Sequence, residues 1–318
     1  MNNIISEIKK SNNIVLLCHK NPDGDAVGST IAMYHILRKL GKEVDLVIDK
    51  VPSKFNFIEG YESIQISSDK QYDVAIILDT ASVERINNPN NIIENIPRKI
   101  VIDHHSSNTH YGDINFVDSR PACCEVVYNI AKEMNIEIDE NIGTALCCGL
   151  LTDTGGLSNP DVKPSTYEVA AELSKIIDIP SIHKKVLGTI TKGQFELNKI
   201  GIQNLEFYKN GQITFTYITE EDLINLELEK SDADIIANLG RNIKGVEVAI
   251  YLRKYKDENR VSLRSNNNID VNEIAKIFGC GGHKTAAGIS TTMEFNELKE
   301  KLIYEVGKKI DEWNLSSK

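Results

Sequence analysis

The sequence lacks a long hydrophobic run, because none of its apolar stretches approaches the length of about 18 residues that a membrane-spanning helix requires. The opening segment, MNNIISEIKKSNN, also lacks the apolar core of an export signal. We therefore expect a cytoplasmic protein that has no membrane partner.

The cysteines lack the spacing of a structural zinc site. The six residues occur as Cys18, the adjacent pairs Cys123-Cys124 and Cys147-Cys148, and Cys280. Zinc sites use spacers of two to four residues, and disulfide frameworks belong to small secreted chains. The pattern predicts buried, reduced thiols.

An excess of positive charge is absent, since 36 Lys and Arg stand against 46 Asp and Glu for a net charge of −10. Proteins that hold long nucleic acids neutralise many phosphates, so we expect no long duplex as a partner. A few local cations would still suffice for a small anionic ligand. The length of 318 residues suggests two domains at about 150 residues each.

The first half of the chain alternates short apolar runs with longer amphipathic segments. This alternation predicts an α/β domain with a parallel sheet over residues 1–185. The expected strands are residues 14–18, 43–48, 74–78 and 99–102, and the expected helices are residues 26–40, 123–134 and 141–151.

The second half repeats this pattern on a smaller scale. After helical segments and a linker at residues 186–205, a second α/β domain is expected over residues 206–318. Its predicted strands are residues 212–218, 246–253 and 260–264, and its predicted helices are residues 271–278 and 296–312. Asn266, Asn267 and Asn268 predict a solvated turn.

Polar side chains follow the predicted strands of the first domain. In open parallel sheets the ligand site lies beyond the carboxyl ends of the strands, so we expect these side chains to converge there. A carboxylate at the end of a later helix is a candidate to join them. The set comprises His19, Asp23, Asp25, Asp79, Asp103, His104, His105 and Asp153.

Five carboxylates in one partly buried site repel one another unless cations neutralise them. Carboxylate and imidazole ligands without thiolate suit Mn²⁺ or Mg²⁺, and the set is large enough for two ions if one carboxylate bridges them. Taken singly, an aspartate in such a position, as for Asp23, Asp25, Asp79 and Asp153, is most often a helix cap or turn residue and not a metal ligand. We interpret His35, His110 and His183 as ordinary helix or loop residues.

The second domain contains a glycine-rich segment, GCGGH at residues 279–283. As a loop, it would let backbone N–H groups approach an anion, although a tight turn is the alternative. Arg264, with Ser265, ends a predicted strand, where a guanidinium can clamp phosphate in a bidentate manner. The alternative for Arg264 is an exposed arginine at a strand end.

These motifs resemble a known family in order and spacing. HKNPDGDAVGS (residues 19–29), LDTAS (78–82), IDHHSS (102–107) and TDTGG (152–156) resemble the four motifs of the DHH phosphoesterase superfamily. VSLRS (261–265) and FGCGGHKTAAG (278–288) resemble its DHHA1 substrate-binding domain. The compact two-domain length resembles the NrnA-type subfamily, although Leu157 and Ser158 replace an aromatic residue that is frequent after the fourth motif.

The resemblance implies two divalent ions, with Mn²⁺ favoured and Mg²⁺ as the alternative. It implies that Asp79 bridges the ions, that His105 contacts the scissile phosphate, and that Asp103 supports the histidines. The implied ligands of one ion are His19, Asp23 and Asp79, and those of the other are Asp25, Asp79, His104 and Asp153. The implied substrate contacts of the second domain are Arg264, Ser265, Gly281, Gly282 and His283.

The resemblance further implies a hydrolase that acts in a cleft between its domains and often forms a homodimer. Its expected reactions are the degradation of short oligonucleotides (nano-RNA) to mononucleotides, the removal of the 3′-phosphate from 3′-phosphoadenosine 5′-phosphate (pAp), or both. Alternatives are a phosphodiesterase for linear or cyclic dinucleotides, a pyrophosphatase or polyphosphatase, and a non-catalytic module that binds nucleotides or RNA.

Overall fold

The computed structural model describes residues 1–266 and 269–316. The chain forms two compact units, Met1–Thr189 and Ile190–Lys318. The division falls inside the stretch predicted to be a linker, where the structure has a helix, α7 (Lys192–Gln203). Among the described residues, no helix is both long and apolar enough to cross a membrane.

The first unit is built on a six-stranded sheet in the order β3-β2-β1-β4-β5-β6. Every neighbouring pair is parallel, as the alternating sequence pattern predicted. The short strands β3 and β6 were not predicted from the sequence, because neither forms a buried apolar run. The strands are β1 (Asn13–Leu17), β2 (Glu43–Val47), β3 (Ile64–Gln65), β4 (Val74–Leu78), β5 (Lys99–Asp103) and β6 (Ile114–Val117).

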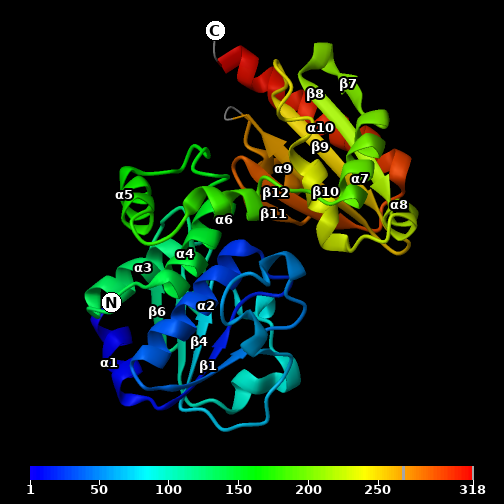
Figure 1. Cartoon of the computed structure of the whole chain (residues 1–318). Coiled ribbons are helices and arrows are strands. Elements are labelled where there is room, and N and C mark those ends of the chain that lie inside the picture. Colours follow the sequence, from blue (N-terminus) through cyan, green and yellow to red (C-terminus); the bar gives the residue numbers. More distant parts are fainter. Residues whose placement is uncertain (267–268, 317–318) are drawn as a thin grey trace. The chain divides into compact units, whose positions relative to one another are not determined.

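Helices cover one face of this sheet, as Figure 1 shows for α2, α3 and α4. Successive strand residues point to opposite faces, so Ile14 and Leu16 pack under the helices while Val15 and Leu17 pack against Ile92 of the opposite layer. The helices are α1 (Asn2–Lys10), α2 (Gly24–Lys39), α3 (Cys123–Glu133), α4 (Glu140–Asp153), α5 (Pro164–Leu173) and α6 (Ile179–Val186). Short 3₁₀ segments lie at Ser53–Phe55, Tyr61–Ser63, Val83–Arg85 and Pro89–Asn95.

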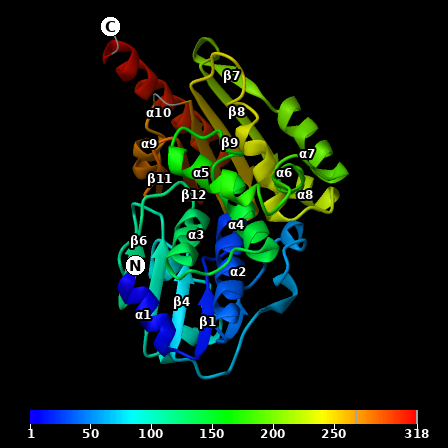
Figure 2. The same cartoon turned by 60° about the vertical axis from the view of Figure 1, so that its left-hand side comes forward.

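The second unit has a mixed six-stranded sheet in the order β11-β12-β10-β9-β8-β7. Only β8 and β9 pair in parallel among these described strands. The strands are β7 (Glu206–Tyr208), β8 (Ile213–Thr219), β9 (Val248–Lys254), β10 (Asn259–Ser265), β11 (Gly281–His283) and β12 (Ala286–Thr291). Figure 2 shows α9 (Val271–Ile277) and α10 (Phe295–Ser316) on one side of this sheet, and α7 and α8 (Glu220–Asn225) on the other. Two 3₁₀ segments, Lys209–Gly211 and Lys230–Asn238, complete the unit.

The glycine-rich segment corrects one prediction. It was expected to be an open loop, but Gly281–His283 form strand β11, which pairs with β12. A Cβ added to Gly282 would lie 2.5 Å from the carbonyl oxygen of Ala286, so glycine is needed there for the close approach of two strands. The N–H of Gly282 donates to Asn272 Oδ1 at 2.9 Å and is not free to hold an anion.

The cysteine prediction also needs one correction. All six thiols are free, and five are buried, but Cys280 is only half-buried because it lies beside the exposed strand β11. The solvated turn predicted at Asn266–Asn268 lies partly outside the described residues, which omit Asn267 and Asn268.

Glycine in α4 allows α2, α3 and α4 to pack closely behind the sheet. A Cβ added to Gly149 would lie 2.3 Å from Cys124 Sγ and 2.6 Å from Asp25 Oδ1, which is closer than atoms can approach. A Cβ added to Gly143, in the same helix, would meet side chains alone, with Ile177 nearest at 3.2 Å and Leu173 and Ile138 at ordinary van der Waals distances of 3.8 and 3.9 Å. The position of the Asp25 carboxylate therefore depends on this packing.

We predict that Gly149→Ala lowers the free energy of unfolding by about 1–3 kcal/mol, because the added methyl group must displace its neighbours. Gly143→Ala is the matched control in the same helix, and we expect it to be neutral or stabilising through its better helix propensity. Urea denaturation followed by circular dichroism measures both. Equal effects of the two substitutions would contradict the prediction.

Candidate metal centre

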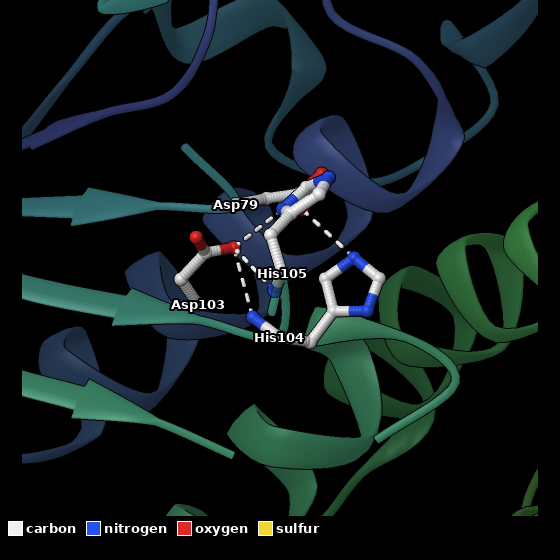
Figure 3. A group of neighbouring side chains, drawn as sticks. All are labelled: Asp79, Asp103, His104 and His105. Carbon is white, nitrogen blue, oxygen red and sulfur yellow. Dashed lines mark hydrogen bonds and ion pairs between the residues drawn. The ribbon is translucent and has the colours of Figure 1, made fainter. Parts of the chain in front are cut away.

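The carboxyl ends of β1, β4 and β5 carry the polar residues that the sequence analysis singled out. These strands are neighbours in the sheet, so His19, Asp79 and Asp103 emerge side by side at one edge. Figure 3 shows Asp79 and Asp103 together with His104 and His105, whose rings lie 4.4 Å apart between centroids. The predicted convergence at this edge is thus present in the structure.

One cluster of possible ligand atoms consists of His19, Asp23 and Asp79. His19 Nε2 lies 3.6 Å from Asp79 Oδ2 and 3.8 Å from Asp23 Oδ1. Asp23 is also the N-cap of α2, because its Oδ1 accepts hydrogen bonds from the N–H groups of Asp25 and Ala26. The helix-cap alternative for Asp23 is therefore correct, and it coexists with a place in the cluster.

A second cluster consists of Asp25, His104 and Asp153, with Asp79 again at its side. His104 Nε2 lies 3.3 Å from Asp79 Oδ1, 3.5 Å from Asp153 Oδ2 and 3.8 Å from Asp25 Oδ2. One oxygen of Asp79 thus faces His19 and the other faces His104. This arrangement brings together both of the ligand sets implied by the family resemblance, with Asp79 between them.

Hydrogen bonds orient the imidazoles of His19 and His104. His19 Nδ1–H donates to the carbonyl of Lys20 at 2.9 Å, and His104 Nδ1–H donates to the carbonyl of Arg120 at 2.9 Å. Each bond leaves Nε2 directed at the carboxylates, which is the orientation that a metal-binding histidine needs once Nε2 has lost its proton.

Asp103 has a different environment from the other carboxylates. It is fully buried, and its oxygens accept hydrogen bonds from the His104 N–H at 2.8 Å, from His105 Nδ1–H at 2.7 Å and from Asn108 Nδ2 at 2.6 Å. Its lone pairs are largely used inside the protein. Asp103 therefore fixes the loop that carries both histidines, and Asn108 is a supporting residue that the sequence analysis missed.

Asp25 is held by the start of helix α3. The N–H groups of Cys123 and Cys124 donate to its two carboxylate oxygens, the second at 2.9 Å. The N-cap residue of α3, Ala122, has no side chain able to cap the helix, so Asp25 caps it from another helix. The positive end of the α3 dipole also favours the ionised form of Asp25.

Asp79 occupies a costly position. Its backbone φ is 51°, in the left-handed region that non-glycine residues adopt infrequently, aspartate and asparagine more readily than most. Its side chain is only 2% exposed, and Oδ1 accepts no hydrogen bond within the described part of the chain. A buried carboxylate oxygen with no donor fits a place for a cation.

The pKa values reflect this crowding of acids. Burial, with the negative charge of Asp79, raises the pKa of Asp25 to about 7, and burial likewise raises the pKa of Asp153. Burial opposes protonation of His19, but the carboxylates of Asp23 and Asp79 outweigh it and raise its pKa to about 10. For Asp79 burial again favours the neutral form, but His104 and His19 hold its pKa below the usual range.

The donor set suits divalent cations. The two clusters offer carboxylate oxygens and imidazole nitrogens but no thiolate, a combination suited to Mn²⁺, Mg²⁺ or related ions. The raised pKa of His19 means that its imidazole keeps a proton in the metal-free site. A metal ion that binds there would displace this proton. The residues present therefore fit a metal centre.

Two further supporting residues, Arg120 and Glu125, were not found from the sequence. Glu125 is fully buried in α3 and accepts hydrogen bonds from Arg120 Nη1, Ser165 Oγ and Thr166 Oγ1, each at 2.8 Å. This ion pair fixes the segment whose carbonyl binds His104. The signal in the sequence was an acidic residue inside the largely apolar run CCEVVYNIA.

The structure separates the predicted substrate residues of the second unit. Arg264 of β10 pairs with Ala286, which pairs with His283 of β11, so Arg264 and His283 share one face of the sheet. Ser265 follows Arg264 in the strand and is buried on the opposite face. Gly281 lies in β11 with Gly282. Arg264 is half-buried, so it is not the exposed strand-end arginine of the alternative interpretation.

Comparison with known families agrees with this architecture. Residues 13–150 match the DHH family, N-terminal domain, and residues 210–312 match the DHHA1 domain. The chain therefore belongs to the DHH phosphoesterase family and is a hydrolytic enzyme of that class, as its motifs predicted. The family is metal-dependent, in keeping with the acidic and histidine clusters.

Named relatives span nearly the whole chain. The bifunctional oligoribonuclease and PAP phosphatase NrnA of Thermus thermophilus is 28% identical over 302 residues, which cover 90% of this chain and 86% of that protein. The protein of the same name from Bacillus subtilis is 25% identical over 297 residues, covering 90% and 92%. A crystal structure of an exopolyphosphatase-related protein from Bacteroides fragilis has a TM-score of 0.88 at 25% identity and covers 96% of this chain and 95% of that one.

We predict that Glu125→Gln weakens Mn²⁺ binding by about 10-fold, because a neutral side chain holds Arg120 and the carbonyl behind His104 less firmly. Isothermal titration of the protein with Mn²⁺ measures the change. Glu133→Gln, at the exposed end of the same helix, is the control and should bind Mn²⁺ like the wild type. Unchanged affinity in Glu125→Gln would show that the ion pair does not position His104.

We also predict that the metal-free protein loses stability as pH rises from 5.5 to 8. The folded state raises the pKa of Asp25 to about 7 and that of His19 to about 10, so it binds protons that the unfolded chain releases. Urea denaturation in EDTA measures this loss. Added Mn²⁺ should stabilise the protein more at pH 8 than at pH 5.5, because cations then replace the missing protons. Greater stability at pH 8 in EDTA would contradict the sign.

Proposed function

We propose that this protein is a two-metal phosphoesterase that hydrolyses short oligonucleotides to mononucleotides and removes the 3′-phosphate of pAp. The observation that carries this proposal is that the two clusters share the carboxylate of Asp79. Its Oδ2 faces His19 of one cluster, and its Oδ1 faces His104 of the other. The named activities of the relatives from Thermus thermophilus and Bacillus subtilis support the choice of substrates.

The proposed ligands divide into two sets that share Asp79. We assign His19, Asp23 and Asp79 to one ion, and Asp25, Asp79, His104 and Asp153 to the other. Mn²⁺ is our first choice and Mg²⁺ the second, because both accept mixed oxygen and nitrogen ligands. When bound, such ions supply positive charge that stabilises the phosphoryl oxygens and lowers the pKa of water.

The remaining side chains at the sheet edge have positioning and binding roles. The hydrogen bond from His105 Nδ1–H to Asp103 Oδ1 fixes the ring, so we propose that Nε2 of His105 meets an oxygen of the scissile phosphate. Asp103 supports this contact from behind and does not itself touch the substrate. No side-chain nucleophile is needed, since water attacks phosphorus in line.

In the second unit we propose Arg264 and His283 as contacts to the substrate's phosphate and nucleotide, because they share one sheet face. The chemistry of a guanidinium fits a phosphate group. Ser265 was expected to contact the substrate, but its buried side chain faces away from Arg264. We therefore propose that it shapes the end of the strand. Gly281 and Gly282 bring β11 close to β12 and so place His283.

We predict that Asp79→Asn and His105→Ala each lower kcat by about 100-fold or more on a linear di-adenylate and on pAp in Mn²⁺, because each removes a charge or contact at the phosphate. EDTA should abolish the wild-type activity. His110→Asn, an exposed loop substitution compatible with the left-handed backbone at that position, is the control. Wild-type rates in both Asp79→Asn and His105→Ala would refute the proposal.

Polyphosphate is a second candidate substrate, favoured by the likeness to the exopolyphosphatase-related protein from Bacteroides fragilis. Phosphate release from pyrophosphate, polyphosphate, pAp and di-adenylate under the same conditions separates the two functions. Faster turnover of polyphosphate than of both nucleotide substrates would favour this candidate over the first.

A further inference from the structure

A pocket lies at the carboxyl edge of the first sheet, on the side of β1 away from Asp103. Its volume is about 350 Å³, within the range of small-molecule sites. The loops after β1, β2 and β3 and the segment before Ile92 form its walls. The lining residues are Lys20, Asn21, Asp49, Lys50, Ile66, Asn87, Asn88 and Pro89.

The pocket adjoins the metal centre through the chain itself. Lys20 directly follows His19, so their Cα atoms are about 3.8 Å apart. Asn87 closes the same strand end, because its N–H donates to the carbonyl of Cys18 at 2.9 Å and its Nδ2 donates to the carbonyl of Asp49 at 3.2 Å. A phosphoester held at His19 and Asp79 would thus have one of its substituents beside this pocket.

The lining has three chemical features. Two ammonium groups, Lys20 and Lys50, stand against the single carboxylate of Asp49, a local positive balance in a chain of net charge −10. Asn21 and Asn87 supply carboxamides. Ile66 is an isolated aliphatic side chain that is 70% exposed at the pocket.

Two lining residues combine a left-handed backbone with a side chain that has no partner among the described residues. Asn21 and Lys50 both have left-handed backbones, with φ of 55° and 56°, which is unfavourable for lysine. Among the residues that the structure describes, neither side chain has a hydrogen-bond or ion-pair partner. Backbone conformations of this kind are concentrated where loops form binding sites.

These features together match a nucleotide. A heterocyclic base has apolar faces for Ile66 and polar edges for carboxamides, and a phosphate pairs with an ammonium group such as that of Lys50. Inorganic phosphate alone would make no use of Ile66. An apolar ligand would make no use of the two lysines.

We propose that this pocket is a subsite for a second nucleotide of an oligonucleotide substrate, with its base against Ile66 and a phosphate on Lys50. The inference rests on the proposed function, because an oligonucleotide has nucleosides on both sides of its scissile phosphate. In pAp the 3′-phosphate has a nucleoside on one side only. The subsite therefore serves oligonucleotides and not pAp.

The test uses the double substitution Lys50→Ala and Ile66→Ser, which changes two exposed side chains outside both metal clusters. Lys10→Ala, an exposed lysine on α1, is the control. We expect kcat/KM for a linear di-adenylate to fall about 5- to 10-fold through KM, with kcat/KM for pAp unchanged. Equal losses on both substrates, or no loss on di-adenylate, would overturn the proposal.

A binding measurement separates this proposal from the proposed function. Isothermal titration with a phosphorothioate-linked di-adenylate in Mn²⁺ reports affinity without requiring turnover. Weaker binding by the double variant than by the wild type and Lys10→Ala supports the subsite, even if the wild type hydrolyses neither substrate. Equal titration curves for all three proteins, including three curves without binding, overturn the subsite whatever the activity.

Discussion

The first unit depends on the burial of one carboxylate, that of Asp79. A side chain that is 2% exposed and carries an oxygen with no hydrogen-bond donor requires positive charge nearby. His19 and His104 supply it on opposite sides, and in doing so they draw Asp23, Asp25 and Asp153 into the same small volume. The site can exist in two electrostatic states, one held by protons on the histidines and one held by metal ions, and both depend on the same geometry.

The helices behind the sheet hold this crowded site in place. Asp25 accepts hydrogen bonds from the first N–H groups of α3, and Gly149 of α4 leaves room for its carboxylate. The Glu125 ion pair then ties the segment before α3 to α5 through Ser165 and so fixes the carbonyl that orients His104. Charge repulsion at the sheet edge is thus opposed by helix packing and by hydrogen bonds that no single motif contains.

The metal-ligating candidates could be predicted from the sequence because their placement follows from local rules. Asp79 and Asp103 end apolar strands, and the carboxyl ends of parallel strands share one edge. The roles of Glu125 and Asn108 could not be predicted in this way, since they depend on contacts to residues distant in sequence or on the exact turn of a loop. The strand β11 was missed for a related reason: three small or polar residues have little strand propensity, and only pairing with β12 makes them a strand.

The net charge of −10 predicts neither the metal centre nor the basic residues near it, because acidic and basic side chains lie in separate places on the molecule. The acidic residues cluster with the histidines of the metal centre, while Lys20, next to His19, and Lys50, after the neighbouring strand β2, line a pocket at the same sheet edge. In the second unit, burial lowers the pKa of Arg264, and the nearby guanidinium groups of Arg241 and Arg253 add to this effect while Asp234 opposes it. Asp234 already pairs with Arg253 at 2.7 Å, and an anion bound beside Arg264 would relieve the remaining repulsion between the guanidinium groups. An acidic protein can therefore present short, separate anion sites, and such sites favour ligands with a few phosphates over a continuous polymer.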